Sequence, residues 1–304
     1  MTNRILDISE QGFYLRAENG LLVIEEKDRD KPSRTIPFED IAVIILSNRQ
    51  IVLSQSVLSY LAESKAFLII CNERNMPVSA MLPLCGHTLQ AERFIQQASA
   101  SKPTQKNLWK QLVCAKVKAQ ANLLGKLHGS DSGLFELAKQ VKSGDPSNIE
   151  AQAAQRYWPR LFKNIYFYRQ PQVGEPPNNL LDYGYAVLRT IVARAIVSTG
   201  LNVTFGIHHH NRSNSFCLAD DLMEPFRPIV DKAVFEIVDS EGENVPLNKE
   251  TKQKLISPLL GRFNLKGEWR TLFDISVKLA SSLVAVYAGE ENNLILPENM
   301  YDYQ

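Results

Sequence analysis

Long apolar runs and patterned cysteines are both missing from this chain of 304 residues. No apolar stretch approaches the roughly 18 residues that a membrane span needs, since the longest runs only from Ile41 to Leu46. The start of the chain lacks the apolar core of a secretory signal. The 4 cysteines show no CxxC spacing, so neither a zinc knuckle nor a disulfide framework is indicated. We therefore expect a cytoplasmic protein with reduced thiols and no membrane contact.

An excess of charge of one sign is also missing, because the formal net charge is only +1. The charges are nevertheless segregated along the chain. Residues 101–172 contain 12 Lys or Arg against 4 Asp or Glu, and the densest acidic clusters lie at 25–30 and 239–243. A basic middle between acidic ends is typical of a protein that binds a polyanion with one surface. A solvated helix face would give the same pattern.

In the first ninety or so residues, short apolar stretches alternate with turn residues, which is typical of a β-rich domain. Asn19-Gly20 lies between two apolar stretches and supplies the positive φ angles of a tight hairpin turn. Residues 57–64 predict a short helix. Strands are predicted at 4–9, 12–17, 21–26, twice within 34–46, at 66–72 and at 77–82. This spacing predicts a small β-sandwich-like domain over residues 1–92.

The apolar period changes to about 3.6 from residue 91 onward, which predicts helices. Asp145-Pro146 indicates a helix start, with the aspartate at the N-cap and the proline in the first turn. Long, mostly apolar helices are predicted at Leu180–Thr199 and Leu272–Tyr287, and the last residues of the chain form a loosely attached tail. The predicted fold class is α+β, with a larger all-helical domain over residues 93–304.

Histidine and carboxylate side chains gather between residues 206 and 224. His208–His210 precede an acidic segment in which Asp221 and Glu224, three residues apart, share one helix face. With Glu150, near the predicted helix start, they offer the mixed imidazole and carboxylate set that Mg2+ or Mn2+ binds. Such an ion would suit phosphodiester chemistry.

Each of these residues also has a plainer explanation. Glutamates near a helix start are favoured by the helix dipole and need no function. Arg227 follows Glu224 by three residues, so a simple salt bridge would account for that pair. Histidines at loop ends are more often packed or surface residues than ligands.

Four motifs in order resemble the CRISPR-associated adaptation integrase and endonuclease family. They are NIE followed by AQRYW, NNLLDYGYAVLR at 178–189, GIHH at 206–209, and DLMEPFRPIVD at 221–231. The segment DLMEPFRP resembles the corresponding motif of the type II branch of that family, which works beside a large RNA-guided effector. The resemblance implies an N-terminal β-rich domain for dimerisation and a helical catalytic domain.

The resemblance also implies which residues are catalytic. In that family a glutamate, a histidine and an acidic residue hold a catalytic Mg2+ or Mn2+, and these fall on Glu150, His209 and Glu224. The pattern of glycine, two residues, then histidine favours His209, with His208 as the fallback. Asp221 matches a frequent acidic position nearby and is a secondary candidate.

The implied reaction joins a free 3′-hydroxyl of a short DNA duplex to a phosphodiester at the edge of a CRISPR repeat. Basic side chains of the helical domain would then contact backbone phosphates and make binding sensitive to salt. The DNA-binding candidates are Arg156, Arg160, Lys163, Arg169, His208 and Arg227, with Lys106, Lys110, Lys116 and Lys118 as further basic residues. Stacking on splayed DNA ends is expected of Tyr157, Trp158, Tyr166 and Tyr168, although core packing explains each of them equally well.

The implied partners are the donor duplex with its 3′ ends, the CRISPR leader and repeat DNA, and a small CRISPR adaptation partner protein. Two homodimers would flank a dimer of that partner in a heterohexamer, and type II effector proteins are further candidate partners. The tail from Leu294 onward is a candidate docking segment for the small partner. Two rival interpretations remain open: a catalytically idle DNA-binding scaffold, and a stand-alone metal nuclease for branched DNA.

Overall fold

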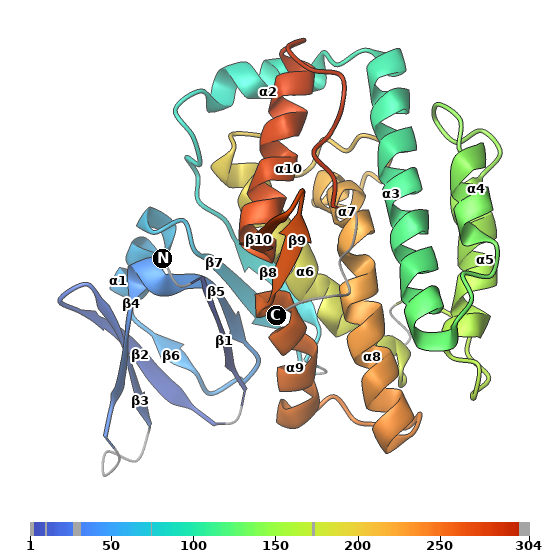
Figure 1. The fold of residues 1–304 in the computed structure, drawn as a ribbon. Coiled ribbons are helices and arrows are strands. Elements are labelled where there is room, and N and C mark those ends of the chain that lie inside the picture. The colour runs from blue at the N-terminus through green and yellow to red at the C-terminus, as the bar shows by residue number, and fades with distance from the viewer. Residues whose placement is uncertain (1–2, 10, 27–31, 74, 172–173, 298–304) are drawn as a thin grey trace. The chain divides into compact units, whose positions relative to one another are not determined.

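A computed structural model describes residues 3–9, 11–26, 32–73, 75–171 and 174–297 (Figure 1). The chain divides into two compact units, Met1–Gly86 and His87–Gln304. The boundary expected from the sequence, between residues 92 and 93, falls inside helix α2 (Gln90–Ala98). This helix belongs to the second unit, where Arg93 Nη1 donates a hydrogen bond of 2.6 Å to the Thr199 carbonyl.

The first unit contains two four-stranded sheets and one helix. One sheet has the order β1-β5-β7-β8, in which β1, β5 and β7 are parallel and β8 is antiparallel to β7; the other has the order β4-β3-β2-β6. The strands are β1 Arg4–Ile8, β2 Phe13–Glu18, β3 Leu21–Glu26, β4 Arg34–Pro37, β5 Ile41–Leu46, β6 Val52–Leu53, β7 Phe67–Cys71 and β8 Pro77–Met81. The helix α1 spans Gln55–Glu63, and a 3-10 turn, η1, spans Phe38–Asp40.

One apolar core holds the first unit together. Leu15 and Leu22 from the second sheet join Ile44 and Leu68 from the first, and Leu61 of α1 joins the same cluster. Burying these side chains is the dominant favourable term for a unit of this size. The sandwich-like β-rich unit predicted from the sequence is therefore confirmed.

The predicted hairpin is also present. Asn19 and Gly20 adopt φ angles of 50° and 75°, and Glu18 pairs with Leu21 across the turn. Positive φ at both central residues is what a type I′ turn requires, and Asn-Gly meets that requirement at low cost.

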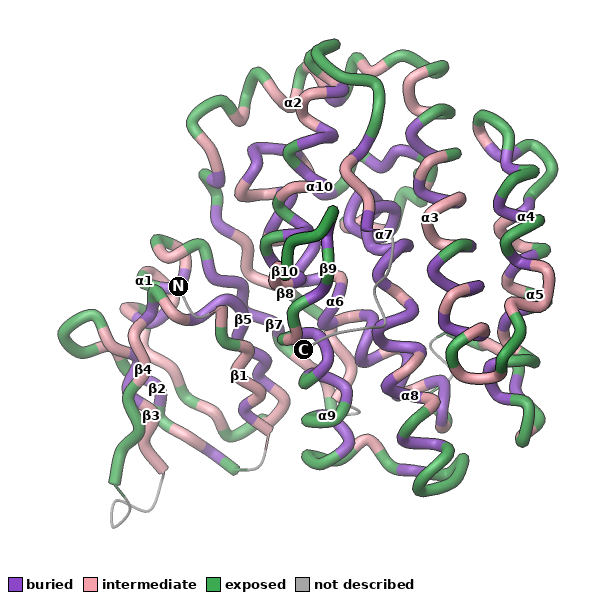
Figure 2. Tube along the Cα trace, in the orientation of Figure 1, coloured by how far each residue is buried: buried purple, intermediate pink, exposed green. Residues whose placement is uncertain are grey.

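The second unit is dominated by helices (Figure 2). After α2 come α3 Lys102–His128, α4 Leu134–Gln140, α5 Ile149–Leu161, α6 Asn178–Ser198, α7 Cys217–Met223, η2 Glu224–Phe226, α8 Arg227–Glu241, α9 Lys249–Ile256, η3 Ser257–Leu260 and α10 Leu272–Tyr287. No helix in the described ranges has the length and apolarity to cross a membrane. The long helices predicted around 180–199 and 272–287 correspond to α6 and α10.

Helix α6 lies at the centre of this unit and packs against α7, α8, α9 and α10. Gly184 permits a close approach of α8, because a Cβ built at this position would lie 2.4 Å from Val230 Cγ1 of α8. Helix α3 runs beside α4 and α5 and also contacts α7, η2 and α8. Elements that lie far apart in the sequence thus meet along α3.

The expectation of an all-helical second domain needs one correction. Strands β9 (Arg262–Leu265) and β10 (Glu268–Thr271) form an antiparallel hairpin closed by Lys266 and Gly267, both with positive φ. The tail is also less loose than expected at its root. Leu294 N donates to Gln111 Oε1 of α3 at 2.8 Å, and Ile295 N donates to Ser282 Oγ of α10 at 2.9 Å. Residues 298–304 lie outside the described part of the chain.

Candidate active site

The start of α5 sets the position of Glu150. The helix begins at Ile149 and its N-cap is Asn148, so the prediction of Asp145 at the N-cap was wrong. Asp145 still caps the helix from a distance, because its carboxylate accepts hydrogen bonds from Ile149 N at 2.9 Å and Glu150 N at 3.0 Å. Two of the open N–H groups of the first turn are satisfied in this way, which fixes the direction of the helix.

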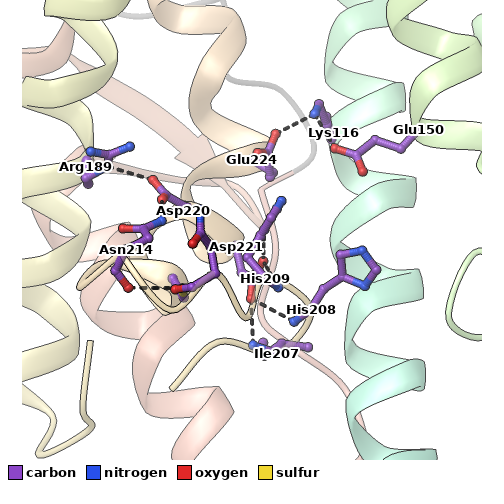
Figure 3. A network of polar contacts seen from close by, with 12 residues as sticks. Lys116, Glu150, Arg189, Ile207, His208, His209, Asn214, Asp220, Asp221 and Glu224 are labelled. Carbon is purple, nitrogen blue, oxygen red and sulfur yellow. Dashed lines mark hydrogen bonds and ion pairs between the residues drawn. The ribbon is translucent and has the colours of Figure 1, made fainter. Parts of the chain in front are cut away.

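Glu150 meets Glu224 across a lysine. Lys116 Nζ of α3 lies 2.6 Å from Glu150 Oε1 and 2.6 Å from Glu224 Oε2 (Figure 3). Glu224, the first residue of η2, is 2% exposed. The two carboxylates that the sequence nominated as ligands therefore converge on one cationic point, although they come from separate elements.

A loop carrying the histidines is held by Asp221, which is completely buried. One carboxylate oxygen, Oδ2, accepts hydrogen bonds from Ile207 N at 2.6 Å and His208 N at 2.9 Å; the other, Oδ1, is 2.5 Å from His209 Nδ1. Gly206 makes this close fold possible, since a Cβ there would lie 2.2 Å from the His209 carbonyl oxygen. Asp221, a secondary ligand candidate, thus anchors the loop and orients His209.

The contact with Asp221 determines which ring nitrogen of His209 is available. In the neutral ring of His209, donation from Nδ1 to the carboxylate leaves Nε2 as the nitrogen with a free lone pair. The neighbouring His208 stacks on Trp109 of α3, with ring centroids 4.2 Å apart and an interplanar angle of 4°. Trp109 also meets His209 edge-on at 5.6 Å. The indole therefore supports both imidazole rings.

The residue before Asp221, Asp220, ties the loop to the centre of the helical unit. Its carboxylate accepts hydrogen bonds from Arg189 Nε of α6 and Asn214 Nδ2, both at 2.6 Å. Adjacent carboxylates thus have separate tasks, as Figure 3 shows: Asp221 faces the histidines and Asp220 faces away from them.

The electrostatic balance favours the charged forms of Glu224 and Lys116. Burial acts to raise the pKa of Glu224, but Arg227 and Lys116 outweigh it and lower the pKa below the ordinary value. Burial acts to lower the pKa of Lys116, and here Glu224 and Glu150 prevail and raise it. The hydrogen bond that His209 Nδ1 donates to the Asp221 carboxylate raises the pKa of His209. Burial lowers the pKa of His208, which favours the neutral ring.

Whether these residues suit a divalent ion can be tested on their geometry. In the ranges that the structure describes, no three His, Cys, Asp or Glu side chains are grouped closely enough to hold one. Glu224 Oε2, however, is buried and receives no well-aligned hydrogen bond within those ranges, although Lys116 and Arg227 lie within 2.6 and 2.9 Å of it. Both neighbours are cations, so this oxygen lies where the protein itself binds positive charge. The donor set of Glu150, Glu224 and His209 therefore fits a hard cation chemically, with an ammonium between two of its members.

The candidate DNA-contacting residues divide into two groups. Arg156, Arg160 and Lys163 are exposed on or just after α5. Arg169 is instead ion-paired with Asp182 and donates to Asn178 Oδ1, so internal contacts occupy its guanidinium.

Arg227 is held inside the site. Its Nε lies 2.9 Å from Glu224 Oε2, and the guanidinium lies 4.5 Å from the centroid of the Tyr185 ring. The salt bridge that the spacing of Glu224 and Arg227 suggested is therefore present, alongside the contact between Glu224 and Lys116.

One of the aromatic residues expected to stack on DNA does not face solvent. Tyr157 is completely buried, and its hydroxyl donates to Asp231 Oδ2 at 2.8 Å. The stacking role is therefore wrong for Tyr157, because a ring at an inward position of α5 belongs to the core. Tyr166 and Tyr168 are exposed.

Three residues of the site were not recognised from the sequence in the roles they have here. Lys116 was expected only as a phosphate contact, and Trp109 carried no signal beyond its apolar helix position. Gln97 of α2 is buried and holds the segment before the histidines: its Nε2 donates to the carbonyls of Asn202 and Phe205, and its Oε1 accepts from Asn202 N. Contacts across about a hundred residues leave no local signature in a single sequence.

The sequence of this chain matches a family of known proteins. The family model described as "CRISPR associated protein Cas1" matches residues 6–258. A CRISPR-associated endonuclease Cas1 from Neisseria meningitidis is 34% identical over 302 residues, which cover 98% of this chain and 97% of that protein. A second such endonuclease, from Pyrobaculum aerophilum, is 28% identical and covers 86% of this chain and 92% of its own length.

Solved structures agree on the fold. A casposase bound to its integration product matches with a TM-score of 0.79 at 20% identity, covering 98% of this chain and 93% of that one. A Cas1 protein from Thermotoga maritima matches with a TM-score of 0.74 at 18% identity, covering 95% and 98%. The match over most of the chain, the identity to a Cas1 endonuclease and the shared α+β fold show that the chain belongs to the Cas1 family of CRISPR-associated proteins.

Proposed function

We propose that this protein is a metal-dependent DNA integrase of CRISPR adaptation, which inserts short duplex DNA into the CRISPR array. The observation that carries the proposal is the convergence of Glu150 and Glu224 on one cationic point. Beside them His209 presents a ring nitrogen whose partner nitrogen is bound by Asp221. Such a set is typical of a site for Mg2+ or Mn2+ at a phosphodiester.

Glu150, His209 and Glu224 would hold the ion, which when bound supplies a Lewis acid for the phosphoryl oxygens. Asp221 keeps the proton of His209 on Nδ1, so that Nε2 remains an acceptor. The 3′-hydroxyl of the donor loses its proton to solvent and its oxygen bonds to phosphorus, while the 3′-oxygen that the strand carrying the repeat held on that phosphorus leaves and takes up a proton. One phosphodiester is made for each one broken, so the reaction needs no energy source. Attack by water at the same phosphorus would give nuclease activity.

The proposed partners extend beyond the DNA substrates. Structures of Cas6-RT-Cas1–Cas2 complexes are among those that share this fold, and one of them matches with a TM-score of 0.77 at 16% identity over 97% of this chain and 36% of that one. We infer a Cas2-type partner, a homodimer formed by the β-rich unit, and two such dimers in a heterohexamer with the partner. Participation of type II effector proteins belongs to the same proposal.

The test is strand transfer from a fluorescent duplex with free 3′-hydroxyls into a plasmid that carries a leader and a repeat. Mn2+ or Mg2+ and the small partner protein are present. Wild type is compared with Glu150→Gln, Glu224→Gln and His209→Ala. The matched control is Glu136→Gln, which changes an exposed glutamate that pairs with Lys139. Labelled plasmid is expected from wild type and Glu136→Gln only, and only without chelator.

Two other results would redirect the interpretation. If all variants bind DNA and none, wild type included, yields product, the protein is an idle scaffold. If wild type cuts branched DNA equally well without the small partner and never joins the donor, it is a stand-alone nuclease.

A further inference from the structure

Lys116 occupies an unusual place for a lysine. Its side chain is only 13% exposed, and its ammonium is within 2.6 Å of carboxylate oxygens from α5 and from η2. Lys118, two residues further along α3, is exposed, lines a groove with Lys110 and Gln111, and forms no ion pair within the described ranges. Lys116 is thus built into the interior of the site, whereas its neighbour belongs to the surface.

The charges around this ammonium nearly cancel. Glu150 and Glu224 contribute two negative charges, and Lys116 and Arg227 contribute two positive charges, with Arg227 Nε 2.9 Å from Glu224 Oε2. Hard divalent ions bind sites that have an excess of negative charge on oxygen ligands. These four side chains together carry no net negative charge. A bound ion and the Lys116 ammonium also compete for the same two carboxylate oxygens.

We propose that Lys116 is a resident counter-cation of the candidate metal site, which weakens binding of a divalent ion to the DNA-free protein and makes that binding depend on a DNA phosphate. The inference rests on the proposed function and deepens it. Without DNA, the ammonium holds Glu150 and Glu224 together and prevents their mutual repulsion. A phosphate in the site restores an excess of negative charge and offers the displaced ammonium another partner.

The linkage between the two ligands is reciprocal. If DNA raises the affinity for the ion by some factor, the ion raises the affinity for DNA by the same factor. Lys116 is a positioning residue in this scheme, because it acts through the two carboxylates and not on the reacting atoms. The site would assemble its ion where a phosphodiester is already present.

The test measures Mn2+ binding by the electron paramagnetic resonance signal of free Mn2+, so it does not depend on turnover. Wild type, Lys116→Met and Lys118→Met are titrated without DNA, and wild type and Lys116→Met are titrated again with a short duplex. Lys116→Met is expected to bind Mn2+ about ten-fold or more tightly than wild type without DNA, because a positive charge next to a divalent ion has been removed. Lys118→Met is expected to match wild type. The duplex should tighten Mn2+ binding to wild type far more than to Lys116→Met.

Several results would overturn the proposal. Equal or weaker Mn2+ binding by a cooperatively folded Lys116→Met protein would do so, as would Mn2+ binding to wild type that does not change when duplex is added. The second measurement uses wild type alone, so it decides the matter even if Lys116→Met fails to fold.

Glu150→Gln separates this failure from that of the proposed function. Mn2+ binding to wild type that Glu150→Gln abolishes, with no effect of Lys116→Met, leaves the metal site in place and removes only the role of Lys116. No Mn2+ binding by any protein, with or without DNA, removes both.

Discussion

Replacing Asp221 with asparagine tests the geometry of the site most directly, because the two side chains have the same shape. Oδ1 of the asparagine can take over the two backbone hydrogen bonds from Ile207 N and His208 N. Its NH2 group then faces His209 Nδ1, where the carboxylate oxygen had been. An amide donor in that place favours the tautomer with the proton on Nε2, so Nε2 loses the lone pair with which it would bind a metal ion.

The expected cost to stability is moderate. A hydrogen bond to a charged group contributes about 1.5–3 kcal/mol and a neutral one about 0.5–1.5 kcal/mol, so the exchange at His209 lowers the free energy of unfolding by about 1–2 kcal/mol. Asp221→Ala would lower it by about 4 kcal/mol or more, because buried N–H groups lose their acceptor. Urea unfolding at pH 7 measures both variants.

The expected loss of activity is much larger than the loss of stability. Strand transfer by Asp221→Asn should fall about 100-fold or more at a temperature where the variant is fully folded. Asp220→Asn is the matched control, because Asp220 contacts Arg189 and Asn214 and not the histidines. It should keep most of the wild-type rate. A folded Asp221→Asn protein with the wild-type rate would refute the assignment of Asp221 as the residue that orients His209.

Three further perturbations test other contacts of the helical unit. Gly206→Ala should lower the free energy of unfolding by about 3 kcal/mol in urea titrations and abolish strand transfer, because its Cβ would lie 2.2 Å from the His209 carbonyl oxygen. A variant with the stability and activity of wild type would contradict the tight path of the histidine loop. Burial raises the pKa of Asp231 to about 6 from 3.8, so the folded state binds the extra proton and stability falls as pH rises from about 4 to 6. Asp231→Asn should remove about 3 kcal/mol of that dependence, and an unchanged pH profile would speak against it. Chelation with excess EDTA should stop product formation. It should shift the melting temperature of wild type by less than about 2 °C, since Lys116 already holds the carboxylates together. A large shift would show that the ion is needed for the fold.

Local signals predicted the local structure well. The Asn19-Gly20 turn, the apolar periods of α6 and α10, and the change from strands to helices were all readable, because each depends on neighbouring residues. Where a local signal was misread, the error was also local: Lys266-Gly267 closes a hairpin that was taken as part of a helical region.

The contacts of the site were less accessible. Glu150, His209 and Glu224 were nominated through a resemblance, and the structure places the two glutamates on one ammonium. That Lys116 supplies this ammonium could not be read from the sequence, because the pairing depends on how α3 packs against α5 and η2. A single sequence without its relatives carries no record of that packing.

Because the two carboxylates stand 74 residues apart in the chain and meet only through α3, no short stretch of this protein holds both ends of the site. A nascent or partly unfolded chain has its acidic groups scattered in solvent, where they have little power to retain a divalent ion. The pair of carboxylates at Lys116 therefore exists only once α3, α5 and η2 have packed together.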